Sequence, residues 1–337
     1  MRAEEALEYF QIEGAVEQIA PFGLGHINDT YIVRTSEGEY LLQQVNTQVF
    51  KKPEILEQNI ARVVQKFPKL FPAQLKTTEN KYHLIGQDFC WRMQAFMSDT
   101  YSPNEVKSEV ETRAVASGYA QMMAAFVTED ASNYELPIPR FHDLNWRLEQ
   151  LDDAINTNFG NRLKGSKTVL EGINSFRWVA EKMDGLIAEG LPLCLCHNDT
   201  KTGNILLNKT DKSFAKVIDL DTLGPGYVLN DYGDIMRSLF TIAPENEADH
   251  TKIVVRPAYL DVLREEFQSL LAQKLTPIEL QTLEFGGLCM TYITAIRFFT
   301  DYLNGDIYYK TSFDKENLVR AKNQLRLLEL MEEYVGQ

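Results

Sequence analysis

Leu193–Leu223, with the sequence LCLCHNDTKTGNILLNKTDKSFAKVIDLDTL, is the stretch on which the fold and the chemistry of this chain depend. Asp199 follows a short apolar run in a segment of turn-forming residues, and Asn204 comes five positions later. Two strand-like apolar runs follow, Ile205–Leu207 and Val217–Leu220, and Asp219 lies at the end of the second. The pattern predicts a pair of strands that carries an acid, an amide and a second acid.

These three polar residues have the order that phosphoryl transfer requires. A carboxylate must orient and deprotonate the acceptor hydroxyl, and oxygen ligands must hold magnesium against the nucleotide phosphates. We therefore predict Asp199 as the catalytic base, Asn204 and Asp219 as magnesium ligands, and Asp199 and Asp219 as contacts to the substrate. The alternative is a polar turn between strands, because Asn, Asp and Gly are common turn residues. The spacing of all three polar residues favours the catalytic interpretation.

The segments HNDTKTGNILL and VIDLD resemble the catalytic and metal-binding motifs of the aminoglycoside phosphotransferase and choline kinase superfamily. Shorter segments resemble the N-acetylhexosamine 1-kinases of that superfamily: Gly25–Asn28, Tyr40–Gln44, Trp91–Arg92, Arg297–Phe298, Asp301–Leu303 and Glu316–Arg320. The resemblance covers nearly the whole chain. It implies an α+β, two-lobed, protein-kinase-like fold with a small, mostly antiparallel β N-lobe and a larger helical C-lobe. It also implies ATP and Mg²⁺ as cofactors.

Composition limits the partners of the chain. The 337 residues are 44% hydrophobic, which suffices for substantial cores, and the formal net charge is −14. Such an acidic chain lacks the basic footprint of a nucleic-acid-binding protein and has no attraction to an anionic membrane. We expect small-molecule partners, no nucleic acid and no membrane, and the composition does not indicate an oligomeric state.

Cysteine content and the chain start favour a cytoplasmic location. The four cysteines are too few and too scattered for a disulfide scaffold. The segment MRAEEALEYF lacks the basic and apolar regions of a signal peptide. The most apolar long stretch, Phe285–Phe299, is shorter than the roughly 20 residues that span a bilayer and predicts a buried helix.

Residues 1–98 are predicted to form the nucleotide-binding lobe. Strand patterns cover Val16–Ala20, Tyr31–Arg34, Tyr40–Val45, Tyr82–Ile85 and Phe89–Phe96, and a helix is predicted from Pro53 to Phe67. The segment between the first two strands carries Gly23, Gly25, His26 and Asn28, and glycines let a backbone approach phosphates closely. We predict these four residues as nucleotide contacts.

The third strand lacks a residue that kinases usually have there. A lysine on this strand normally pairs with the nucleotide phosphates, whereas this chain has Gln43 and Gln44. Both are predicted to contact the nucleotide, with Arg34, Lys51 or Lys52 as further candidates for the phosphates. The backbone from Ala95 to Ser98, with Ala95 and Met97 as its contacts, is expected to bind the adenine edge.

Residues 99–337 are predicted to form the helical lobe, which follows a hinge at Met97–Asn104. Helical patterns cover Glu105–Phe126, Arg147–Asn156, Val169–Ile187, Arg256–Leu271, Pro277–Leu303 and Leu318–Tyr334. Gly224–Gly226 is predicted as a turn. Asp143 is predicted to cap a helix, and Asp231 or Asp234 to support the catalytic loop.

The acceptor is predicted to be an N-acetylhexosamine phosphorylated at O1. Arg297 and Asp301 are one helical turn apart and share a face with each other, and Tyr308 follows closely. By the resemblance, these residues contact the sugar. The alternatives are an intrahelical ion pair of Arg297 with Asp301, a different acceptor (choline, homoserine, a thioribose or an aminoglycoside), and a catalytically inactive nucleotide-binding protein, which the missing lysine suggests.

Overall fold

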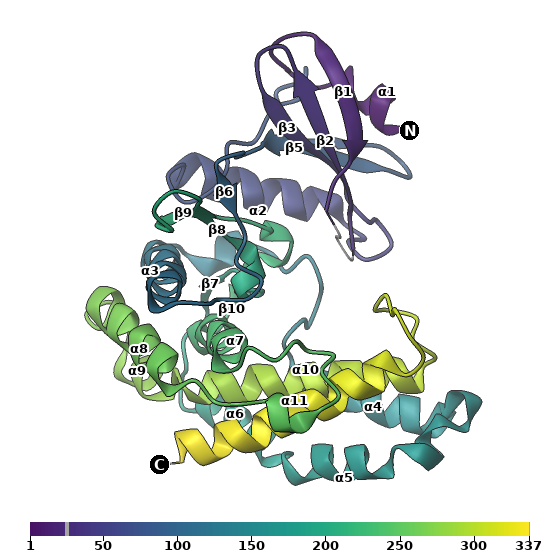
Figure 1. The fold of residues 1–337 in the computed structure, drawn as a ribbon, viewed down its shortest axis with the longest axis vertical. Helices are drawn as coiled ribbons and strands as arrows, with labels where there is room; N and C mark the ends of the chain where they lie inside the picture. Colours follow the sequence, from purple (N-terminus) through teal and green to yellow (C-terminus); the bar gives the residue numbers. More distant parts are fainter. Residues whose placement is uncertain (24–26, 337) are drawn as a thin grey trace.

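The computed structural model describes residues 1–23 and 27–336. The chain forms a small β-rich lobe and a larger helical lobe, with short strands between them (Figure 1). The small lobe contains an antiparallel sheet in the order β1-β2-β3-β5-β4. Its elements are α1 (Ala3–Leu7), β1 (Val16–Pro21), β2 (Asp29–Thr35), β3 (Glu39–Gln44), α2 (Pro53–Lys66), β4 (His83–Ile85) and β5 (Cys90–Ala95). All five predicted strands and the predicted helix are present.

The two faces of this sheet are covered differently. Val33, Leu42 and Trp91 are buried beneath α1 in a small core of their own. Helix α2 contributes its apolar stripe, including Leu56 and Ile60, to the main core instead. Helix α2 therefore connects the small lobe to the rest of the molecule.

Short strands carry the catalytic segment. Strand β7 (Cys194–Cys196) pairs with β10 (Gly224–Gly226), and a second small sheet has the order β6-β8-β9. The members of the second sheet are β6 (Thr100–Tyr101), β8 (Ile205–Asn208) and β9 (Phe214–Val217).

The structure corrects three sequence predictions in this region. Gly224–Gly226 is a strand rather than a turn, because its backbone pairs with Cys194–Cys196. The strand predicted at Val217–Leu220 lies at Phe214–Val217 instead, and it ends at Val217 because Val217 pairs with Ile205, the first residue of β8. The predicted hinge contains β6, which is held by pairing with β8.

The helical lobe is built around α10, most of whose residues are buried. Its helices are α3 (Glu109–Phe126), α4 (Leu144–Thr157), α5 (Lys167–Ser175), α6 (Trp178–Ala188), α7 (Val228–Phe240), α8 (Pro257–Leu271), α9 (Pro277–Thr282), α10 (Phe285–Leu303) and α11 (Glu316–Val335). Short 3-10 segments are η1 (Ala131–Asn133), η2 (Phe159–Gly165), η3 (Thr202–Asn204), η4 (Leu220–Thr222) and η5 (His250–Lys252). Within the described ranges, no helix is long and apolar enough to cross a membrane.

Two helices predicted as continuous are each divided in two. The stretch Val169–Ile187 forms α5 and α6, with the break after Ser175, and Pro277–Leu303 forms α9 and α10. The first break follows Asn174-Ser175, whose short polar side chains compete with the backbone for hydrogen bonds. Helix α7, which was not among the predicted helices, is almost entirely buried.

Glycines allow α7 to pack directly on α10. A Cβ atom on Gly286 would lie 1.8 Å from the carbonyl oxygen of Leu229, and one on Gly233 would lie 2.1 Å from the carbonyl carbon of Gly286. The two backbones therefore touch without intervening side chains. This contact fixes the position of α7, which carries Asp231 and Asp234.

We expect Gly286→Ala to lower the free energy of unfolding by at least about 1–3 kcal/mol, because the added methyl group would overlap backbone rather than a movable side chain. Gly185→Ala is the matched control. Gly185 lies within α6, and its added Cβ would meet no atom within 4 Å, so the change should stabilise the protein slightly. Urea unfolding measures both, and equal effects of the two variants would contradict the proposed contact.

Candidate active site

The loop that carries Asp199 is fixed by a buried carboxylate. The backbone N–H groups of His197 and Asn198 donate to the two oxygens of Asp231, at 2.8 and 2.7 Å. Asn198 has a φ of 64°, a conformation that Asn tolerates better than most residues. The His197 ring is buried and bonds the backbone oxygen of Ile218 at 2.9 Å. Asp231 therefore supports the catalytic loop, as the sequence predicted.

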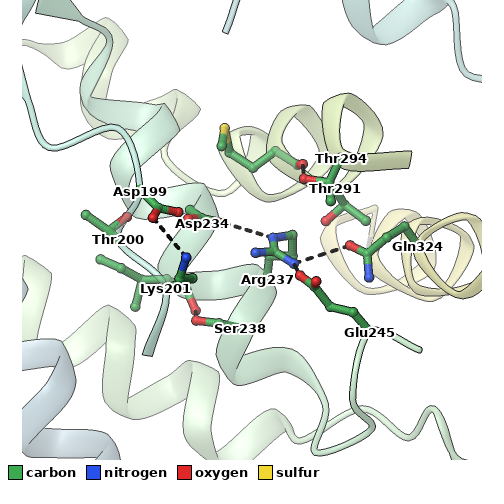
Figure 2. A network of polar contacts seen from close by, with 12 residues as sticks. Asp199, Thr200, Lys201, Asp234, Arg237, Ser238, Glu245, Thr291, Thr294 and Gln324 are labelled. Carbon is green, nitrogen blue, oxygen red and sulfur yellow. Dashed lines mark hydrogen bonds and ion pairs between the residues drawn. The ribbon is translucent and has the colours of Figure 1, made fainter. Parts of the chain in front are cut away.

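Asp199 is held by two donors from its own loop. Its Oδ2 accepts hydrogen bonds from Lys201 Nζ at 2.9 Å and from Asn204 Nδ2 at 2.7 Å, and Figure 2 shows the lysine pointing at the carboxylate. Burial alone would raise the pKa of Asp199, but Lys201, the neighbouring His197 and Asn204 outweigh it and lower this pKa to about 2. Asp199 is therefore ionised at neutral pH and keeps a fixed orientation.

Asp219 and Asn204, the predicted magnesium ligands, lie in adjoining segments, because the N–H of Ile218 donates to the Asn204 carbonyl at 3.0 Å. Among the described residues, no hydrogen bond involves the Asp219 carboxylate or Asn204 Oδ1, whereas the Asn204 amide nitrogen is bonded to Asp199. Burial raises the pKa of Asp219 to about 7, and the carboxylates of Asp221 and Asp199 act in the same direction.

These residues fit a magnesium ion that shares its coordination with phosphate and water. Burial and the neighbouring carboxylates both disfavour the charged form of Asp219, and a divalent cation bound there would stabilise it. In the described ranges, no three His, Cys, Asp or Glu side chains converge to hold a metal by themselves. Magnesium usually takes only one or two protein carboxylates.

A buried polar network lies behind the catalytic loop. Asp234 accepts a hydrogen bond from Arg237 Nε at 2.8 Å, and the same guanidinium reaches Glu245 at 2.6 Å (Figure 2). Gln324 on α11 accepts a longer one at 3.4 Å. The network connects α7 to α11, and Asp234 lies close to Asp199 in Figure 2. Asp234 is a supporting residue, paired with Arg237 rather than exposed to a substrate.

The predicted nucleotide contacts of the small lobe are partly occupied by internal contacts. Asn28 donates to Asp221 at 2.6 Å and accepts from the backbone of Asn46 at 3.0 Å. Gln43 accepts from Arg92 Nε at 2.9 Å and donates to Thr30. Gln44, next to Gln43 on β3, is half-buried. Gly23 has a φ of 76°, and the predicted contacts Gly25 and His26 lie outside the described residues.

Arg92 occupies the region where a strand lysine was expected. It lies opposite Gln43 in the pairing of β3 with β5, and its guanidinium forms a buried ion pair with Asp221. Of the proposed substitutes, Arg34 is bonded to Glu39 at 2.7 Å, and Lys51 and Lys52 are exposed. Burial acts to lower the pKa of Arg92, but Asp221 and Asp219 more than compensate and raise it. A single arginine thus connects the sheet to the segment that carries the predicted metal ligand.

The segment after β5 offers a free backbone donor. The N–H of Ala95 donates to the Ala73 carbonyl at 2.8 Å, and the Met97 carbonyl accepts from Thr100. The Met97 N–H has no hydrogen-bond partner among the described residues. Met97 therefore has a donor available for an adenine edge, whereas the donor of Ala95 is already occupied.

Arg297 and Asp301 do not form the ion pair that was considered as an alternative. The Arg297 guanidinium lies over three aromatic rings, with centroids at 4.9 Å for Phe141, 5.6 Å for Tyr309 and 5.9 Å for Tyr308. Asp301 instead accepts the backbone N–H groups of residues 307, 308 and 309, together with the amide of Asn317.

The predicted role of Asp301 as a substrate contact is therefore corrected to a structural one. Both of its oxygens are used to shape the loop after α10, and the residue is buried. That loop presents Tyr308, which is 47% exposed. Tyr308 and Arg297 remain available to an acceptor.

The two lobes, the Asp199 loop and the Asp219 segment together define a protein-kinase-like phosphotransferase. The sequence model of the phosphotransferase enzyme family matches residues 18–256, more than half of the chain. The chain belongs to this family.

Solved structures confirm the predicted fold class. A microcompartment-associated aminopropanol kinase is similar over 99% of this chain and 97% of its own, with a TM-score of 0.67 and 13% identity. A spectinomycin phosphotransferase in complex with ADP and spectinomycin has a TM-score of 0.66 and 13% identity, over 99% of both chains. A choline kinase from Streptococcus pneumoniae has a TM-score of 0.55 and 13% identity, over 94% of both chains.

Several residues of the site were not singled out from the sequence. Lys201 had a visible signal, because it lies two positions after Asp199 in the catalytic segment. Arg92 and Asp221 are 129 positions apart, and only folding brings them together. Arg147 on α4 and His142 before it lie in the same aromatic cluster as Arg297. Nothing in the sequence near either residue indicates that it lies there.

We expect Asp221→Asn to destabilise the protein by about 3–5 kcal/mol, because it leaves the buried Arg92 guanidinium without a counter-charge. Glu39→Gln is the matched control. It breaks the largely exposed Arg34–Glu39 pair on the same sheet and should cost at most about 1 kcal/mol. Denaturant unfolding measures both, and a loss below 1 kcal/mol for Asp221→Asn would show that the pair is not needed.

We expect Asp199→Asn to lower kcat by about 10²–10⁴-fold, because the amide keeps the shape of the carboxylate and removes its ability to take a proton. Affinity for the nucleotide should stay nearly unchanged. Asp211→Asn, on the exposed turn of the same segment, is the control and should retain full turnover. Turnover of Asp199→Asn within a few-fold of the parent would exclude it as the base.

Proposed function

We propose that this protein is an ATP- and Mg²⁺-dependent kinase that phosphorylates the anomeric O1 of N-acetylhexosamines such as N-acetylglucosamine and N-acetylgalactosamine. The main observation behind this proposal is that Asp199 is ionised and held in place by Lys201. Arg297, which lies beside Tyr308, is within electrostatic reach of that carboxylate. Membership of the phosphotransferase enzyme family supports the reaction class. The resemblance of the Arg297 segment to hexosamine kinases supports the acceptor.

The chain's own residues account for most of the proposed reaction. Asp199 would orient the acceptor hydroxyl and take its proton as the phosphoryl group transfers. Lys201 would keep that carboxylate in place and offset charge on the transferring group. Asn204 and Asp219 would hold magnesium, which when bound neutralises charge on the nucleotide phosphates. The Met97 N–H would bind the adenine edge.

Cationic acceptors fit this pocket less well than a neutral sugar. Choline or an amine would need carboxylates or an open aromatic cage. Here Phe141, Tyr308 and Tyr309 surround the guanidinium of Arg297, so the cage already contains a cation. A sugar hydroxyl or acetamide oxygen can accept hydrogen bonds from that guanidinium, which has several donors.

The test is a panel of acceptors with magnesium and ATP, with ADP release as the readout and phosphorus NMR to locate the phosphate. The panel contains both N-acetylhexosamines, glucose, choline, homoserine, a thioribose and an aminoglycoside. Phosphate on O6, or choline turned over faster than any hexose, would refute the proposal. No turnover of any acceptor would support the catalytically inactive alternative.

We expect Arg297→Ala and Tyr308→Ala to raise the KM for the sugar by about 10–100-fold, the value of one or two charge-assisted hydrogen bonds, with the KM for ATP within about twofold. Ile307→Ala is the control, since this neighbouring side chain is 80% exposed and should leave both constants unchanged. An ATP KM that moves as far as the sugar KM would place these residues at the nucleotide instead.

A further inference from the structure

Two arginines from different helices meet at one aromatic ring near the catalytic base. The guanidinium carbon of Arg297 on α10 lies 4.9 Å from the ring centre of Phe141, and that of Arg147 on α4 lies 5.9 Å from the same centre. Arg147 donates to the Phe141 carbonyl at 2.8 and 3.2 Å and to the side-chain oxygen of Gln150 at 2.9 Å. All of these acceptors are neutral.

Neither guanidinium has an ion-pair partner within the described residues, and their hydrogen-bond and ring contacts are all with uncharged groups. Arg147 and Arg297 are half-buried, and the two arginines that are fully buried each have such a partner: Arg92 pairs with Asp221 and Arg237 with Asp234. The chain also carries 48 acidic against 34 basic residues, so carboxylates are abundant. Two positive charges beside each other without a carboxylate are costly to desolvate. Burial and the nearby Arg297 together lower the pKa of Arg147 to about 10.

His142, which lies beside the same aromatic ring, has a buried nitrogen without a hydrogen-bond partner among the described residues. The ring of His142 stacks on Phe141 with centroids 4.5 Å apart, and its Nδ1 is buried without a hydrogen-bond partner among the described residues. Burial, Arg297 and Arg147 lower the pKa of His142 to about 3, so the ring is neutral and can offer one N–H donor. Two cations and a neutral donor form a site for an anion.

The cluster is within electrostatic reach of Asp199. The Asp199 carboxylate acts on the pKa of both His142 and Arg297. The residues come from α4, α10 and the loop after α10, all in the helical lobe, whereas Gln43 and Met97 lie in or beside the sheet of the small lobe (Figure 1). The cluster therefore belongs to the acceptor side of the site rather than to the nucleotide side.

We propose that the preferred acceptor is a hexosamine that carries an anionic substituent, held by Arg147 and Arg297 while its anomeric hydroxyl lies at Asp199. This inference rests on the proposed function and specifies its substrate class. The shared chemistry is a carboxylate, sulfate or phosphate on the sugar, since each can accept bidentate hydrogen bonds from a guanidinium. A neutral hexosamine would use Arg297 and leave the charge of Arg147 without a counter-charge.

The first experiment needs no variant. It compares kcat/KM for N-acetylglucosamine with its 3-O-lactyl ether, its 6-sulfate and its 6-phosphate, and the methyl ester of the lactyl ether is the uncharged control of matched size. We expect at least one anionic sugar to exceed N-acetylglucosamine by about 10–100-fold, as expected for charge-assisted hydrogen bonds. The methyl ester should lose that advantage. The three anions identify which group the site accepts.

The second experiment assigns the preference to the cluster. Arg147→Gln should reduce the ratio of kcat/KM between the anionic and the neutral sugar at least tenfold, and Arg147→Lys should restore part of it because the charge remains. Arg140→Gln is the matched control: it removes a positive charge seven residues away that is exposed and already bonded to Asp143 at 2.7 Å. It should leave the ratio unchanged. Thermal unfolding of each variant confirms that it is folded.

The outcomes separate this inference from the proposed function. If neutral and anionic hexosamines are phosphorylated equally well, the inference is overturned and the hexosamine kinase stands. If no hexosamine is phosphorylated, the proposed function fails and the inference fails with it. If Arg147→Gln changes the KM for ATP as much as the KM for the sugar, the cluster binds nucleotide phosphate and the inference is also overturned.

Discussion

The pair of hydrogen bonds from the backbone of His197 and Asn198 to Asp231 is the contact on which the active site depends. It fixes the start of the loop, so that Asp199, Lys201 and Asn204 can bond one another in a defined arrangement. Asp231 is itself fixed because α7 packs backbone to backbone on α10 through Gly233 and Gly286. The helical core therefore sets the position of the catalytic loop, because Asp231 is buried and both of its oxygens accept short hydrogen bonds from that loop.

The small lobe is attached to this site by charge as well as by packing. Arg92 and Asn28, on or beside the sheet, both bind Asp221, two residues after Asp219. Three carboxylates, Asp199, Asp219 and Asp221, would repel one another, and Arg92 and Lys201 each offset part of that charge. Burial, together with the neighbouring carboxylates, raises the pKa of Asp219, and a cation bound there would stabilise its ionised form.

The distribution of charge divides the site into two halves. The half built from β9, η4 and the small lobe is acidic and fits a metal-bound nucleotide. The half built from α4, α10 and the loop after α10 has two arginines that form no ion pair with any described residue, although the chain as a whole is strongly acidic. Removing such charges from water is costly unless a ligand supplies a counter-charge. An acceptor bound there, as proposed, would face a different electrostatic environment from the nucleotide.

The sequence alone predicted the main strands and helices and the catalytic segment, and the resemblance of its motifs implied the two-lobed architecture. Those features are local: strand alternation, helix periodicity and the spacing of Asp199, Asn204 and Asp219 all lie within short windows of the chain. Pairings between distant segments required the tertiary structure. Arg92 meets Asp221, and Arg147 meets Arg297, through contacts separated by more than a hundred positions, and nothing near either arginine in the sequence indicates its partner. Asp301 is a further case in which the sequence did not indicate the partner. Its position on the helix predicted Arg297 as a neighbour, whereas the backbone N–H groups of the following loop donate three hydrogen bonds to its carboxylate.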